Sequence, residues 1–187
     1  MAERWRRHRL VHLIVGALIV VLLTYLIVDW FLIEQPPRLE RQEVEKRVAW
    51  ERTNYSKVED GLYVGGFVPA PPSGTRAVLN VCQSKDPYHA EVHRWDPIDD
   101  GEPAPGIDWL CEQVEFVASQ RRAGLPLYVH CHAGISRSVM VVTAYLMARD
   151  GCTRDQALAS IRSKRSFVRP NLWFMELLAE WEEFLKG

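Results

Sequence analysis

Short apolar runs alternate with longer helical patterns through the last two thirds of the chain. A short apolar run rich in strand-forming residues predicts a strand at 125–129. Apolar residues at helical spacing, with glycines as stop signals, predict helices at 107–123 and 137–151. We therefore expect an α/β fold in which a central, parallel-rich sheet is flanked by helices on both faces.

The two helices expected after residue 151 carry start signals of their own. Thr153 and Gln156 have the spacing of a capping box. Asn171 can cap the last helix, whose apolar residues recur at helical spacing: Leu172, Met175, Leu178 and Trp181.

A second pattern lies at the N-terminus, where Leu10 to Val28 form an apolar run without Asp, Glu, Lys or Arg. As a helix, this run would be about 28 Å long, close to the thickness of a bilayer core. Trp30 and Phe31 follow where an interfacial aromatic belt is expected. The run has no polar face and no small-residue cleavage site after it, so it predicts an uncleaved transmembrane helix over 10–32.

These patterns divide the chain into a basic segment 1–9, the span 10–32, a charged stalk 33–56 that is helical over 40–50, and one domain, 57–187. The arginines of 1–9 favour an inside N-terminus, but 33–56 is also rich in basic residues. Four cysteines without an evident disulfide framework favour a reducing compartment. The protein is expected in the membrane, with the side that carries the domain left open.

Cys131 and Arg137 stand across a turn that joins the strand at 125–129 to the following helix. In such a loop the N–H groups of His132, Ala133, Gly134, Ile135 and Ser136 can hold a tetrahedral dianion together with the helix N-terminus. The same positive field favours a nucleophilic thiolate at Cys131. Arg137 can bind two phosphoryl oxygens, and Ser138 can donate a hydrogen bond to the sulfur. The pattern indicates phosphate chemistry that needs no metal.

Other interpretations of these side chains are weaker. His130, Cys131 and His132 are adjacent and cannot easily converge on one metal ion, so His130 is interpreted as a residue that braces the loop. Cys82 is either a buried thiol or the partner of Cys131 in a reversible disulfide. A net charge of −1 without a basic stripe argues against nucleic acid as a partner.

With these residues the chain resembles the cysteine-dependent protein phosphatases, and among them the dual-specificity family. The family signature is matched by His130, Cys131, Gly134, Arg137 and Ser138. Further similarity extends the resemblance over about 57–185: the segments 61–66 and 77–81 look like the family's first two strands, and 165–171 is similar to the segment before its last helix. Two departures stand out: 66–76 is short and proline-rich where many relatives carry a helix, and Glu176 replaces a frequent Gln.

The resemblance implies an aspartate on a separate loop that protonates the leaving oxygen. Of Asp96, Asp99 and Asp100, the family pattern favours Asp100, with Asp99 as the close alternative. It further implies a cysteinyl-phosphate intermediate and no metal or organic cofactor.

The expected function is a membrane-anchored phosphatase that acts on phosphorylated proteins. The alternatives are a phosphatase for phosphoinositide or related phospholipid headgroups and a phosphate-binding module without turnover. Relatives that act on lipid headgroups tend to have lysines in the loop, whereas His132, Ala133, Ile135 and Ser136 stand here.

Overall fold

The computed structural model describes residue 12 and residues 15–28 and 41–187. Residues Lys46–Gly187 form one compact unit. Along the chain the elements are α2 (Arg41–Arg52), β1 (Tyr55–Glu59), β2 (Leu62–Gly65), β3 (Ala77–Asn80), β4 (Val92–Trp95), α3 (Ile107–Arg122), β5 (Leu127–His130), α4 (Arg137–Asp150), α5 (Arg154–Lys164) and α6 (Leu172–Phe184).

The sheet has five strands in the order β1-β2-β5-β3-β4, with β5 in the middle. Strand β1 is antiparallel to β2, and the other pairs are parallel. The predicted α/β fold with a parallel-rich sheet is therefore confirmed, and its three predicted strands correspond to β2, β3 and β5. The two edge strands were not predicted, because each is only half-buried and lacks the continuous apolar run of an inner strand.

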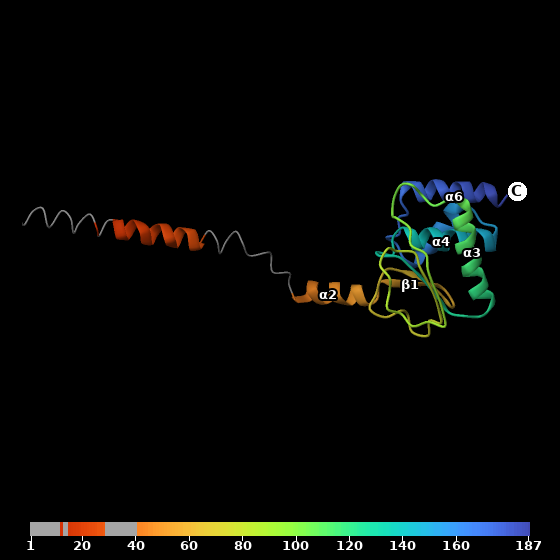
Figure 1. Ribbon diagram of the computed structural model, residues 1–187, viewed down its shortest axis with the longest axis horizontal. Coiled ribbons are helices and arrows are strands. Elements are labelled where there is room, and N and C mark those ends of the chain that lie inside the picture. Colours follow the sequence, from red (N-terminus) through yellow and green to blue (C-terminus); the bar gives the residue numbers. More distant parts are fainter. Residues whose placement is uncertain (1–11, 13–14, 29–40) are drawn as a thin grey trace, which may run out of the picture. The chain divides into compact units, whose positions relative to one another are not determined.

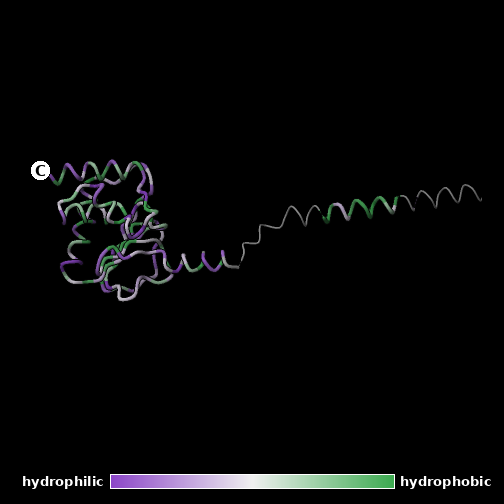
Figure 2. The backbone as a smooth tube through the Cα atoms, turned by 180° about the vertical axis from the view of Figure 1, so that it is seen from behind, coloured by the Kyte–Doolittle hydropathy of each residue, from purple (hydrophilic) through white to green (hydrophobic). Residues whose placement is uncertain are grey.

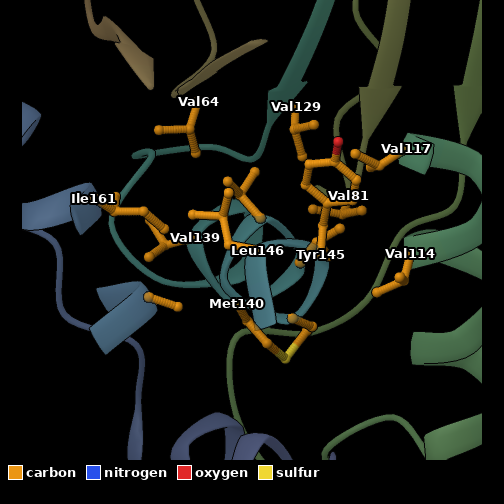
Figure 3. Packing of buried hydrophobic residues seen from close by; sticks show 14 of the residues in the cluster. Val64, Val81, Val114, Val117, Val129, Val139, Met140, Tyr145, Leu146 and Ile161 are labelled. Atoms are coloured by element: carbon orange, nitrogen blue, oxygen red, sulfur yellow. The ribbon is translucent and has the colours of Figure 1, made fainter. Parts of the chain in front are cut away.

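Helix α4 is the centre of the larger hydrophobic core. All its residues from Arg137 to Met147 are buried, which fits a helix that is apolar nearly all round. It contacts α3, α5 and α6 as well as strands β2 and β5. These helices group together beside the sheet in Figure 1. Figure 3 shows α4 side chains among those of its neighbours, including Val64, Val129, Val114, Val117 and Ile161.

The opposite face of the sheet is covered differently from the prediction. A smaller cluster forms there from Val68, Val78, Tyr88 and Tyr128, and within the described chain no helical residue belongs to it. Residues 66–76, all of them described, contain no helix and carry several prolines. The expectation of helices on both faces was therefore wrong for this face, since irregular segments replace the helix.

The predicted helix starts are present. Thr153 and Gln156 form the capping box of α5, and the Asn171 side chain accepts a hydrogen bond from the Phe174 N–H at the start of α6. The buried face of α6 differs in part from the prediction, because Leu172 is exposed. The residues of α6 that are buried are Phe174, Leu177, Leu178 and Trp181.

The N-terminal apolar run is described in part. Residues 15–28 are helical and mostly apolar, as the green segment of Figure 2 shows. Their large apolar side chains are exposed. Within the described residues, no helix combines the length and the apolar character needed to cross a membrane. Except for residue 12 and residues 15–28, the predicted span 10–32 lies outside the described residues. The stalk helix predicted over 40–50 is found as α2.

Two glycines with left-handed backbones offer a matched test of the fold. Gly151 ends α4 with φ 62°, and open space surrounds the position of a Cβ. Gly134, with φ 69°, lies in the loop between β5 and α4, where a Cβ would overlap the backbone of Gly65 and Gly66. We expect Gly151→Ala to lower the free energy of unfolding by about 1 kcal/mol. Gly134→Ala should lower it by about 3 kcal/mol or more, because the backbone of β2 must also move.

Urea unfolding of the full chain, followed by circular dichroism, measures both changes. Equal losses for the two variants would contradict the assigned packing of the β5–α4 loop against β2.

Candidate active site

The β5–α4 loop, residues 131–136, leaves the central strand at His130 and enters α4 at Arg137. Ser136 occupies the N-cap position of α4, but its side chain makes no capping hydrogen bond within the described chain. The first N–H groups of α4 are therefore free of a side-chain cap, and the positive end of the helix dipole faces the loop. An anion above the loop would be stabilised by both.

The carbonyl groups of four successive loop residues are bound from outside the loop. Each has its own donor: His132 O accepts from Phe67 N–H (2.8 Å), Ala133 O from Asn54 Nδ2 (3.2 Å), Gly134 O from Arg165 Nε (2.8 Å) and Ile135 O from Arg169 N–H (2.9 Å). Since the C=O and N–H of a trans peptide point in opposite directions, outward carbonyls turn the following N–H groups inward. The Gly134 N–H accordingly points at Cys131 Sγ, 3.3 Å away.

Cys131 is the sulfur at the bottom of this loop, with 1% of its surface exposed. Its Sγ lies 3.3 Å from Ser138 Oγ in the first turn of α4. The same Ser138 hydroxyl can donate to Gly65 O at 3.1 Å, so its single proton can turn toward either acceptor. The sulfur thus has the Gly134 N–H on one side and the Ser138 hydroxyl on the other.

Arg137 is held beside the loop with most of its side chain buried. One guanidinium nitrogen, Nη1, donates to Ile98 O at 3.2 Å. The buried Nε lies 3.5 Å from Asp100 Oδ2 but makes no hydrogen bond with any residue that the structure describes. A buried N–H without an acceptor is costly, so this fork is suited to a ligand that brings oxygen atoms.

Asp100 is the candidate acid that the structure brings to the loop. Its Oδ1 accepts hydrogen bonds from Ser136 Oγ (2.6 Å) and Asn171 Nδ2 (3.0 Å). Asp99 instead accepts from Gln83, and its carboxylate is at the surface. Asp96 accepts from Gln113 of α3. Of the three, the geometry therefore places Asp100 beside Arg137 and leaves Asp99 and Asp96 with other partners.

His130 is braced by a buried carboxylate that the sequence did not reveal. Its Nε2 lies 3.1 Å from Asp86 Oδ2, and both side chains are fully buried. Asp86 also accepts from Asn80 Nδ2 and the Tyr88 N–H, and His93 lies within 3.2 Å. Burial alone would raise the pKa of Asp86, but the hydrogen bonds of His130 and Tyr88 lower it below its ordinary value. A carboxylate can only accept, so His130 donates through Nε2 and its ring is held in one orientation.

Arg165 and Asn54 were also missed as parts of the site. The Arg165 side chain, with 3% of the residue exposed, reaches Gly134 O, Ala133 O and the Asn54 side-chain oxygen. Arg165 does lie in the segment that resembles the family, so it could have been flagged. Asn54 precedes β1 and carries no such signal.

Among the described residues, no group of three or more His, Cys, Asp or Glu side chains could hold a metal ion. All four cysteines, each within the described chain, are free thiols. Cys82 is buried and donates to Ser84 O at 3.2 Å, and burial raises its pKa above the ordinary value. In this structure Cys82 is thus a buried thiol, one of the two states considered from the sequence.

Comparison with known proteins matches this site to one family. The family described as "Dual specificity phosphatase, catalytic domain" matches residues 73–184. Dual specificity protein phosphatase 1 of Homo sapiens is 36% identical over 112 residues, which are 58% of this chain and 30% of that protein. The chain thus covers less than a third of this relative's length. Dual specificity protein phosphatase 1 of Arabidopsis thaliana is 33% identical over 139 residues, 70% of each protein.

The solved structures agree with the sequences. The crystal structure of human DUSP28 superposes with a TM-score of 0.66 at 25% identity, over 72% of this chain and 96% of that one. The shared part includes a sheet flanked by helices, and the sequence matches span the β5–α4 loop with its Cys131 and Arg137. On this evidence the chain belongs to the dual specificity phosphatase family, whose members are cysteine-dependent phosphatases, and carries that family's catalytic domain.

Proposed function

We propose that this protein hydrolyses phosphate monoesters on phosphorylated proteins through a cysteinyl-phosphate intermediate. The observation that supports this most is the position of Cys131 Sγ under the inward-facing Gly134 N–H, at the base of a loop that ends at Arg137, whose buried Nε has no hydrogen bond within the described chain. The loop residues His132 to Ser136 would hold the phosphoryl oxygens with their N–H groups. Catalysis would then depend on positioning and fixed charges.

In the first step the Cys131 thiolate attacks phosphorus in line with the leaving oxygen. The S–P bond forms as the P–O bond breaks, and Asp100 transfers its proton to the leaving alcohol or phenol. Arg137 stabilises the charge on the transferring phosphoryl group with its two-pronged fork.

In the second step water attacks the phosphorus of the cysteinyl phosphate. Asp100, now a carboxylate, accepts a proton from the water while the S–P bond breaks and inorganic phosphate forms. Ser138 turns its hydroxyl from Gly65 O toward Sγ and stabilises the departing thiolate, for which the distances of 3.1 Å and 3.3 Å are suitable.

The other two functions considered from the sequence are less well supported. A module without turnover does not require an acid, yet Asp100 is held against the loop by Ser136 and Asn171. A lipid-headgroup substrate with additional phosphates would favour cations around the loop, and residues 132–136 contain no Lys or Arg. The exposed member of the loop, His132, has an imidazole side chain in place of a lysine or arginine.

We also infer that the N-terminal apolar run attaches the enzyme to a membrane. The support is the run without charged side chains from Leu10 to Val28 and the exposed apolar side chains on the helical residues 15–28. Such a surface is unfavourable in water but stable in lipid. The side of the membrane on which the catalytic domain lies is not part of this proposal.

Variants of Cys131 and Arg137 test the covalent mechanism. Cys131→Ser keeps the loop but replaces the thiolate with a hydroxyl that stays protonated, so turnover should be lost while inorganic phosphate still binds. Arg137→Lys keeps the charge but loses the fork, and kcat should fall by roughly 10²–10³-fold. Steady-state kinetics with an aryl phosphate and calorimetry with inorganic phosphate measure the two effects. Turnover that persists in Cys131→Ser would overturn the intermediate.

Paired variants of Asp100 and Asp99 test the acid. Asp100→Asn retains an acceptor for Ser136 but has no acidic proton, so turnover of alkyl and phenyl phosphates should fall by roughly 10²–10⁴-fold. A nitrophenyl phosphate, whose leaving group needs no proton, should be much less affected. The matched control is Asp99→Asn, since Asp99 contacts Gln83 and not the loop. The assignment fails if Asp99→Asn, and not Asp100→Asn, shows this dependence on the leaving group.

The membrane proposal predicts the behaviour of the full chain in cell fractions. Protein of full length should remain in the membrane pellet after washing with alkaline carbonate, because an inserted helix is held by the bilayer core. A chain that lacks residues 1–32 should move to the supernatant. If the full-length protein is released by the wash, the apolar run is not an anchor.

A further inference from the structure

A cleft of about 430 Å³ opens directly beside the β5–α4 loop. We call it the side cleft and define it by its lining residues Trp50, Asn54, Phe67, Val68, Pro69, His132 and Ala133. Two larger clefts, of about 710 and 620 Å³, are lined by residues of α3 and include no residue of the loop. The side cleft thus differs from both, since His132 and Ala133 belong to the cleft and to the loop.

The wall of the side cleft is fixed before any ligand binds. The Phe67 N–H donates to His132 O, and the Phe67 ring packs against Tyr88 at 6.2 Å and His130 at 6.1 Å between ring centroids. The next N–H, that of Val68, donates to the Tyr88 hydroxyl at 3.0 Å. Burial raises the pKa of Tyr88 to about 12, so this hydroxyl stays protonated at neutral pH and can also donate to Val68 O. A preformed wall lowers the entropy cost of binding.

The chemistry of the lining selects an apolar occupant. Trp50 is 47% exposed, although a large aromatic ring is normally buried, and it faces the cleft together with Phe67 and Pro69. Two polar atoms at the base are already engaged: His132 O with Phe67, and Ala133 O with Asn54 and Arg165. The lining as described contains no Lys or Arg, so it offers no cation to a second phosphate group.

We propose that the side cleft binds an apolar or aromatic side chain of a peptide substrate, located one or two residues from the phosphorylated residue. This inference rests on the proposed phosphatase function and adds a sequence preference to it. In an extended peptide, neighbouring residues are about 3.3 Å apart along the chain, so a phosphate held over the loop places flanking side chains at the cleft. Trp50 and Phe67 are the residues that set the preference, as rigid aromatic contacts do in other recognition sites.

The test uses the full chain and a set of phosphotyrosyl peptides. The parent peptide has alanine at the two positions before and the two positions after phosphotyrosine, and each test peptide has one of them replaced by phenylalanine. At one position or more, phenylalanine should raise kcat/KM by about tenfold or more, the effect of burying an aromatic side chain. In Trp50→Ala this advantage should shrink to less than about threefold, mainly through KM.

Val48→Ala is the matched control, because Val48 is an exposed apolar residue of the same helix α2 and does not line the cleft. It should retain the full advantage of the phenylalanine peptide. Phe67→Leu provides a second variant that keeps an apolar side chain next to the loop, and its advantage should also be reduced. Circular dichroism establishes that each variant is folded.

The outcomes separate this inference from the proposed function. Equal kcat/KM for all peptides, or an advantage that persists in Trp50→Ala, would overturn the side cleft as a peptide subsite while phosphatase activity stands. If Trp50→Ala lowered turnover of phosphoinositide micelles and left the peptides unchanged, the occupant would be a lipid and this inference would be wrong. A wild-type protein that hydrolyses neither peptides nor aryl phosphates would overturn both.

Discussion

The structure of the active site depends on one constraint: the carbonyl groups of the β5–α4 loop are bound on its outer side. The backbone of such a loop has as many C=O acceptors as N–H donors, and only the N–H donors stabilise an anion. Binding the carbonyls of residues 132–135 to Phe67, Asn54, Arg165 and Arg169 removes the acceptors from the inner surface. The planarity of the peptide bond then turns the N–H groups that follow to the inner side, and the Gly134 N–H points at Cys131 Sγ. The donors that an anion would meet are thus set by contacts made outside the site.

Arg165 shows how this arrangement is maintained at an electrostatic cost. Its guanidinium is buried, and burial lowers its pKa from the ordinary value. The acceptors that it binds are neutral oxygen atoms of Gly134, Ala133 and Asn54, and its charge also lies 4.3 Å from the centre of the Phe167 ring. A carboxylate partner would cancel the charge beneath the loop, whereas neutral acceptors leave it uncompensated. The positive charge near the loop that would attract a phosphate therefore includes Arg165 as well as Arg137 and the helix dipole.

The residue patterns predicted the parts of the site that are local, and the family resemblance added Asp100, but other partners that are distant in the sequence were missed. The strand, loop and helix around Cys131 follow one another within the chain, so their pattern was visible, as were the caps at Thr153 and Asn171. Asp86, by contrast, is 44 residues from His130, and Asn54 is 79 residues from Ala133. Such pairs meet because the parallel strands β2, β3 and β5 end at the edge of the sheet where the antiparallel β1 begins, and the order of the strands cannot be derived from apolar patterns. The proline-rich composition of 66–76 already distinguished this segment from the helix of many relatives. The side cleft next to it could not be predicted from the sequence.

The irregular segment 66–76 connects the proposed substrate selection to phosphate binding. Phe67 lines the side cleft with its ring and holds His132 O with its N–H, so one residue contacts both a flanking side chain and the loop. A side chain bound in the cleft would press on the wall that orients the peptide group between His132 and Ala133. Binding energy from a part of the substrate that does not react can then be used to fix the geometry of the part that does. A helix at 66–76 would use its backbone N–H groups within the helix and could contribute to this face only by packing. The irregular segment keeps backbone donors available, and it uses that of Phe67 to bind the loop.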